Sequence, residues 1–309
     1  MEIVARQLVR ALRGARSQQA FSRRLGYRSN PVAEWEAGRR FPTAAEILRA
    51  CRVVGVNVEA AFAAFPPGTS PTDLPRWLDG LRGDRPLASV ARDLGRSRFA
   101  VARWLSGEAE PRLPDFLALV DLLTGRLPDL LALLVPIEEV PALLQRRRVL
   151  EASRRLAWEQ PWSQAVVAAL DTAGYRALPA HRDGAIAERF GFDVATERAC
   201  LADLEAARVI ARDGERWVLR RPLVVDTAGD AGALRRGRQF WLEVARGRAE
   251  APSPEDVFAV NVFSVAEADL ERIRERFAAF YREVRQIVAA SEPTDTVALL
   301  SAQVIGWSG

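Results

Sequence analysis

The chain has 309 residues, of which 49% are hydrophobic and 27% charged, a balance typical of folded globular domains. All 44 basic residues are arginine, and the lack of lysine excludes a Walker A phosphate loop and Schiff-base catalysis. A single histidine and two cysteines leave too few ligands for a two-histidine zinc site or a disulfide framework, so we expect neither a metal nor a cofactor.

The chain has no apolar run that could cross a bilayer. The longest one lies near Leu130–Val135 and falls far short of the roughly 18 residues required. The N-terminal residues Met1 to Arg6 lack the apolar core of a secretion signal. We therefore expect a cytoplasmic protein without a membrane partner.

In chain order, the first elements form a cluster of short helices. Apolar spacing predicts a helix over Ile3–Leu12 and a second from a Ser17 cap to about Leu25. Gly26 permits a sharp turn, and a third helix is expected from about Ser29 to Ala37, ending at Gly38. A fourth helix starts at Thr43, and a short fifth one covers about Val58–Phe65.

One pattern then occurs twice. Each copy contains, in the same order, a leucine-glycine pair, a tryptophan, a glycine and a proline. These are Leu25, Gly26, Trp35, Gly38 and Pro42 and, each 69 positions later, Leu94, Gly95, Trp104, Gly107 and Pro111. Copies in register predict two copies of one small domain, which we place at residues 1–66 and 70–135 and call the first and second repeat.

The stretch from Ser17 to Thr43 resembles the Cro and phage-repressor class of helix-turn-helix, the XRE family. The resemblance implies that the third helix enters the DNA major groove. By this resemblance the residues facing base edges are Ser29, Asn30 and Glu34. Those contacting phosphate are Gln18, Arg28, Arg39 and Arg40. Residues 1–65 also carry a net charge of +6, whereas residues 66–135 are neutral and the remainder has −2.

The second repeat keeps the plan but changes the polar surface. Its second and third helices are expected at Leu87–Leu94 and Ser97–Ser106. Phe99 stands where the first repeat has Asn30, and Glu108 and Ala109 stand where it has Arg39 and Arg40. Two interpretations remain open: the repeat reads a half-site through Arg98 and Arg103, or it has lost DNA and packs against protein.

A linker helix is expected at 136–160, followed by three helices and a hairpin at 161–228 that are typical of a winged helix. The acidic residues of its third helix favour a structural role, and His181 is expected on a surface loop. At 229–309 we expect helices Ala231–Arg248 and Ala266–Ala290, with strands at 257–265 and Thr296–Ile305. Residues 145–309 resemble an uncharacterised C-terminal module of predicted bacterial transcriptional regulators, although Gln303 to Trp307 depart from its Phe-Pro-Leu-like ending.

The sequence thus predicts a mainly α protein with a small β component: two tandem repressor-like helix-turn-helix bundles, a winged helix and a C-terminal β-α-β piece. The function expected from it is sequence-specific regulation of transcription on double-stranded DNA, with a C-terminal half that dimerises or senses a partner. The alternative is a protein-interaction adaptor that no longer meets DNA. No spacing of acidic residues singles out a catalytic pair, so an enzyme is not expected.

Overall fold

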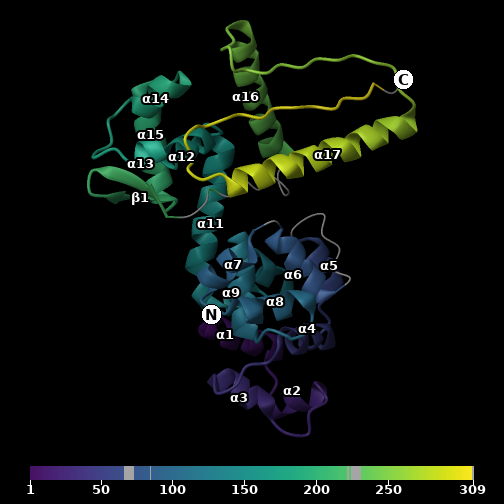
Figure 1. The fold of residues 1–309 in the computed structure, drawn as a ribbon. Coiled ribbons are helices and arrows are strands. Elements are labelled where there is room, and N and C mark those ends of the chain that lie inside the picture. The colour runs from purple at the N-terminus through teal and green to yellow at the C-terminus, as the bar shows by residue number, and fades with distance from the viewer. Residues whose placement is uncertain (66–72, 84, 221–222, 224–230, 308–309) are drawn as a thin grey trace. The chain divides into compact units, whose positions relative to one another are not determined.

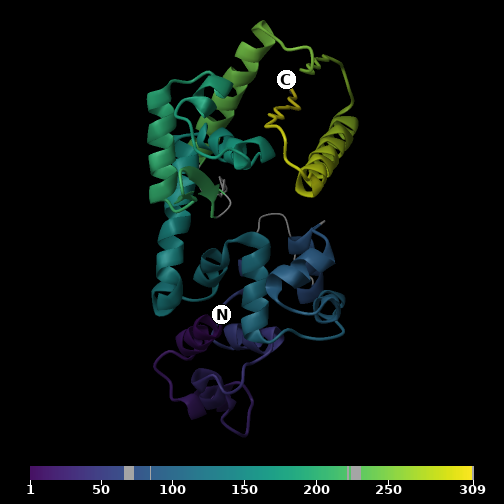
Figure 2. The same cartoon turned by 60° about the vertical axis from the view of Figure 1, so that its left-hand side comes forward.

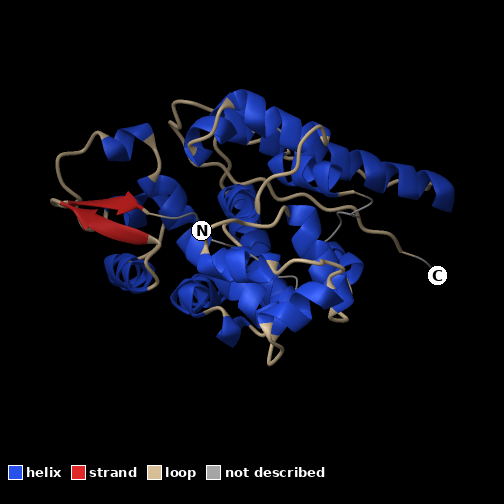
Figure 3. Ribbon diagram, turned by 90° about the horizontal axis from the view of Figure 1, so that it is seen from below, coloured by secondary structure: helices blue, strands red, loops and turns tan. Residues whose placement is uncertain are grey.

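The computed structural model describes residues 1–65, 73–83, 85–220, 223 and 231–307 (Figure 1). Over these residues the protein is mainly helical, with one small antiparallel sheet (Figure 3), which confirms the predicted class. The chain divides into two compact units, Met1–Leu150 and Glu151–Gly309, which we call unit 1 and unit 2. The expected domain borders near residues 66–70 and at 228 lie outside the described residues.

Unit 1 contains both repeats, each built from five helices. The first repeat comprises α1 (Glu2–Arg13), α2 (Gln18–Arg24), α3 (Pro31–Ala37), α4 (Ala44–Val53) and α5 (Val58–Ala63). The second comprises α6 (Leu74–Arg82), α7 (Leu87–Leu94), α8 (Arg98–Ser106), α9 (Leu113–Thr124) and α10 (Leu127–Leu134). The 3-10 turn η1 (Ile137–Glu139) and helix α11 (Pro141–Glu159) follow.

Local chemistry sets the helix ends of the first repeat. The Ser17 hydroxyl accepts from the Ala20 amide and caps α2, while Thr43 and Glu46 form a capping box on α4. Helix α3 begins at Pro31, two residues later than expected, because a residue that precedes proline is disfavoured in helical conformation. Ser29 and Asn30 therefore lie before the helix rather than in it.

The two repeats share one hydrophobic core. Trp77 of α6 is 2% exposed and lies between the repeats: its ring centroid is 4.3 Å from that of Phe62 and 6.3 Å from that of Phe65, both of the first repeat. Its indole Nε1 donates to the Phe65 carbonyl at 3.2 Å. Phe116 of α9 packs on the same ring, with centroids 6.3 Å apart. Folding of either repeat thus buries side chains of the other.

Unit 2 begins within α11 and has a second, separate core. Its elements are α12 (Ser163–Leu170), α13 (Ala173–Arg176), α14 (Ala185–Phe190), α15 (Val194–Ala206), β1 (Ile210–Asp213), β2 (Arg216–Leu219), α16 (Ala231–Glu250) and α17 (Glu267–Ala290). The hairpin pairs Ile210 with Leu219 and Asp213 with Arg216, and Gly214 takes the positive φ of +60° that its turn requires.

The expected strands of the C-terminal segment are not formed. Residues 257–265 precede α17 and residues 296–305 follow it. Both were expected to be strands, but neither has strand structure. A strand exists only where a neighbour completes its ladder of backbone hydrogen bonds, and the sole sheet in the described part of the chain is the hairpin. The β-α-β prediction is therefore wrong in its strands and right in its helix. None of the described helices combines the length and the apolar character needed to cross a membrane.

Candidate nucleic-acid interface

Helix α3 is held by its inner face. Val32 and Trp35 are buried, and the edge of the Trp35 ring meets Tyr27 with centroids 5.7 Å apart. The helix ends at Gly38, whose φ of +77° belongs to the left-handed region. A Cβ at this glycine would lie 3.3 Å from the Arg6 side chain, so the residue also allows α1 to approach closely. The outer edge of α3 is thereby fixed in orientation.

A buried carboxylate fastens α3 to α1 and α2. Glu36 is 4% exposed and receives Arg13 Nε at 2.6 Å from α1 and Gln18 Nε2 at 2.8 Å from α2. Arg10 adds an ion-pair contact at 3.7 Å. No sequence motif identifies Glu36, although it follows the buried Trp35 directly in α3. Gln18, expected on phosphate, instead has its amide on this carboxylate.

Asn30 stands at the start of α3, partly exposed, and is braced from α2. The buried Ser22 hydroxyl donates to Asn30 Oδ1 at 2.8 Å and also lies 3.4 Å from the Val32 amide. The Asn30 side chain is therefore oriented before any ligand arrives, with its amide nitrogen still available. Its neighbours Arg28 and Ser29 are exposed.

Glu34 and Arg39 form a two-point ion pair at the other end of this edge. Arg39 Nε and Nη2 donate to the two carboxylate oxygens at 2.8 and 2.7 Å. The hydrogen bonds from Arg39 hold the pKa of Glu34 below its ordinary value, and Glu34 raises the pKa of Arg39. Both side chains are largely exposed, at 45% and 65%. The expected role of Glu34 on a base competes with this pair, whereas Arg39 keeps its Nη1 donors for a phosphate.

Arg28 and Arg40 are the expected phosphate contacts that stay uncommitted. Both are exposed, and within the part of the chain that the structure describes neither side chain forms an ion pair, although Arg40 acts electrostatically on Glu46. Arg49, further along on α4, donates to the Tyr27 hydroxyl at 2.8 Å and stacks over that ring. Burial, followed by Glu46, raises the pKa of Tyr27. The surface around α3 thus offers positive charge next to an oriented polar edge.

The corresponding surface of the second repeat is different in kind. Phe99 of α8 is 72% exposed, and the Arg103 guanidinium lies 5.6 Å from its ring centroid. Arg103 also contacts Glu108 at 3.8 Å. Arg98 is exposed, with no acidic partner among the described residues. The exposed phenylalanine was not counted among the site residues from sequence, although its equivalence to Asn30 was evident.

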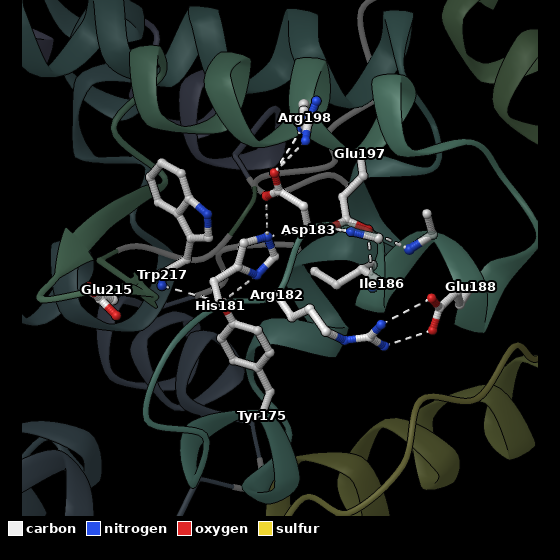
Figure 4. A network of polar contacts seen from close by, with 12 residues as sticks. Tyr175, His181, Arg182, Asp183, Ile186, Glu188, Glu197, Arg198, Glu215 and Trp217 are labelled. Carbon is white, nitrogen blue, oxygen red and sulfur yellow. Dashed lines mark hydrogen bonds and ion pairs between the residues drawn. The ribbon is translucent and has the colours of Figure 1, made fainter.

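Unit 2 contains a buried polar cluster around the only histidine of the chain (Figure 4). The Glu197 carboxylate, 0% exposed, accepts the amides of Gly184, Ile186 and Ala187 and so caps α14. His181 Nε2 lies 3.2 Å from this carboxylate, and its Nδ1 lies 3.2 Å from the Tyr175 hydroxyl. Burial lowers the pKa of His181, although Glu197 and Asp183 act in the opposite direction.

Two expectations are corrected by this cluster. The His181 backbone is a loop, but its side chain is 2% exposed, so the surface position expected for it is wrong. Glu197 was counted among the charges that oppose a groove fit of α15, yet it points inward to the N-terminus of α14. The sequence does not reveal that His181 and Glu197 meet, because α14 separates them along the chain.

The chain matches no curated protein and no solved structure. One known family does match, and it covers residues 147–305, which is just over half of the chain and includes the hairpin, α17 and the His181 cluster. The repeats lie outside the matched residues. By this match the chain belongs to the family defined by a domain of unknown function, DUF4423.

Proposed function

We propose that the protein is a sequence-specific DNA-binding regulator in which α3 of the first repeat reads the major groove. In this proposal the first repeat is a helix-turn-helix formed by α2, the turn at Gly26 and α3. The observation that carries it is the outer edge of α3: an oriented Asn30, the exposed Arg28 and Ser29, and Arg40 beyond it, with the opposite edge buried. An asparagine in such a position can hydrogen-bond adenine at two atoms.

Electrostatics supports the same assignment. Residues 1–65 carry 11 arginines and five glutamates, and one of these glutamates, Glu36, is buried beneath α3 and committed to Arg13 and Gln18. Arg28 and Arg40 are among the arginines whose side chains are exposed and form no ion pair in the described residues, and a polyanion that binds them would release counterions. We therefore expect binding of any duplex at low salt and selection among sequences as the salt concentration rises.

The test uses the full chain and a preferred duplex selected from a random pool. Asn30→Ala is expected to lower affinity for that duplex by about 1–3 kcal/mol and to leave affinity for unrelated duplexes unchanged. Arg28→Ala serves as the matched control, because loss of a phosphate contact weakens all duplexes alike. If Asn30→Ala lowers the affinity for all duplexes equally, Asn30 acts only through its hydrogen bond with Ser22 and does not contact a base. The absence of any binding at low salt would reject the proposal.

For unit 2 we propose a winged-helix arrangement of α12, α14, α15 and the hairpin, with a role in homodimerisation. Residues 257–265 carry apolar side chains on an extended backbone, and Val257, Val260 and Val262 are 92%, 93% and 78% exposed. Antiparallel pairing of this segment with its copy in a second chain would complete both ladders about a twofold axis. Sedimentation velocity should show a dimer for the wild type and a monomer for Val260→Asp with Val262→Asp. A wild-type monomer at micromolar concentration would contradict this role.

The adaptor without DNA contact is the second candidate. It is favoured by the Glu34–Arg39 and Gln18–Glu36 contacts, in which groups expected to meet DNA satisfy one another. It predicts that the full chain captures a protein partner and shows no salt-dependent binding to duplex DNA. The binding measurements described above therefore separate the two candidates.

A further inference from the structure

The two repeats of unit 1 meet about a local twofold axis. Thr43 and Arg112, which are equivalent positions 69 residues apart, form an isolated antiparallel bridge. The Ala44 amide donates to the Pro111 carbonyl at 3.0 Å, and the Leu113 amide donates to the Pro42 carbonyl at 2.8 Å. If the two repeats are exchanged, position by position, each of these hydrogen bonds becomes the other. Reciprocal contacts of this type define a twofold interface.

The helices around the bridge obey the same relation. Helix α4 contacts its equivalent α9, and α5 contacts its equivalent α10. The Arg126 guanidinium, just before α10, lies 5.1 Å from the ring centroid of Phe65, just after α5. Buried side chains of α4, α5, α9 and α10 all belong to the shared core, which holds the repeats together. Figures 1 and 2 show α2 and α3 at one end of unit 1 and α7 and α8 towards the other, with α1 and α4 between them.

The surfaces that this axis exchanges are chemically unlike. Ser29 is exchanged with Arg98, Asn30 with Phe99, and Glu34 with Arg103. Arginine is the common partner of guanine in the major groove, and an aromatic ring contacts the thymine methyl group. Asparagine and glutamate suit adenine and cytosine instead. The α3 surface and the α8 surface would therefore select different bases.

The acidic residues near α8 leave part of its positive charge unpaired. Asp115 is bound by Arg96 at 2.6 Å, and Glu108 lies against Arg103 at 3.8 Å. Arg98 remains without an acidic partner in the described part of the chain. The second repeat lacks equivalents of Arg39 and Arg40, where Glu108 and Ala109 stand. It is therefore suited to discriminating bases and adds less phosphate contact than the first repeat.

We propose that unit 1 is an intramolecular pseudo-dimer that binds one asymmetric duplex site composed of two unlike half-sites, the second read by Arg98, Phe99 and Arg103. This inference rests on the proposed function, because it assumes that α3 reads DNA. A twofold pair of reader helices meets half-sites about one helical turn apart, roughly 10 base pairs. The inference therefore specifies both the spacing and the lack of palindromic symmetry of the target.

The experiment selects bound duplexes from a random pool with the full chain, in parallel for the wild type, for Phe99→Ala with Arg103→Ala, and for the control Arg76→Ala. All three altered side chains are exposed, and Arg76 lies on α6, outside the α8 surface, where it contacts Asp73. The wild type and the control should select a pair of unlike half-sites about 10 base pairs apart. The selected duplexes should contain this pair once or, if two protein chains bind the same duplex, twice. The double variant should keep one half-site and lose the other, with about ten- to hundredfold weaker binding to the full site.

The outcomes separate this inference from the proposed function. A single selected half-site, or two identical half-sites, would overturn the pseudo-dimer and leave DNA reading by α3 in place. Loss of both half-sites in the double variant, with circular dichroism unchanged, would also overturn it. A wild-type chain that enriches no sequence at all would reject the proposed function and the inference together.

Discussion

A substitution at Trp77 tests whether the two repeats fold as one body. The residue belongs to the second repeat, but its ring packs on Phe62 and Phe65 of the first and its indole nitrogen is bonded to the Phe65 carbonyl. Truncation of a buried tryptophan to alanine costs about 3–5 kcal/mol. That loss raises the equilibrium constant for opening by roughly two to three and a half powers of ten.

The two cysteines make the measurement local. Cys51 lies in α4 of the first repeat and Cys200 in α15 of unit 2. Each is fully buried, and burial raises the pKa of each thiol to about 12, so that labelling requires the surrounding structure to open. In the full chain Trp77→Ala should accelerate labelling of Cys51 by the factor given above and leave Cys200 at its wild-type rate.

The control for this experiment is Phe99→Ala, which removes an exposed ring of the same repeat and should change neither rate. An unchanged rate at Cys51 in Trp77→Ala would refute the reasoning, because it would show that the first repeat keeps its core when the second is opened. An equal rise at both cysteines would refute it in another way, by showing that the two units open together.

Three further predictions follow from single contacts. Glu36→Gln should destabilise unit 1 by about 1.5–3 kcal/mol through loss of charged hydrogen bonds, seen as faster labelling of Cys51; a change below 0.5 kcal/mol would contradict the fastening role. Arg28→Ala with Arg40→Ala should reduce the slope of log affinity against log salt by about two on every duplex, measured by fluorescence anisotropy. The pKa of His181 in the folded protein lies below its ordinary value near 6.5, so between these two pKa values the unfolded chain binds a proton that the folded chain does not. The stability of unit 2 should therefore fall as pH drops from about 6.5 towards the folded pKa, by at most about 1.4 kcal/mol per pH unit. Urea denaturation between pH 5.5 and 7.5 should show this slope in the wild type and a flat response in His181→Gln, in which Glu197, Asp183, Arg212 and Tyr175 remain.

The sequence predicted most helices because their signals are local. Leu87–Leu94 was expected with the bounds that the structure has, since apolar spacing and the following Gly95 define it. The strands at 257–265 and 296–305 were not predictable, because alternation shows only that a segment suits a sheet and says nothing of whether a neighbour exists. The hairpin was predicted correctly because the Asp213-Gly214 turn pair brings the neighbouring strand from within the same stretch of chain.

The contacts around the candidate interface divide in the same way. The exposed outer edge of α3 followed from spacing, since Val32 and Trp35 define the inner edge. The mutual pairing of Glu34 with Arg39 and the burial of Glu36 depend on side-chain directions and on α1, which lies far away in sequence. His181 was misplaced for this reason too: the groups that bury it come from α13 and α15.

The bridge between Thr43 and Arg112 has a consequence for how the protein responds to dilution. Separate chains that pair on a duplex come apart as their concentration falls, whereas halves joined by one backbone remain associated in any volume. Since each copy of the duplicated segment occupies only one side of the axis, a substitution alters that side alone. If the proposed pseudo-dimer binds DNA, it can acquire preference for a non-palindromic target one half at a time, which a pair of identical subunits cannot do.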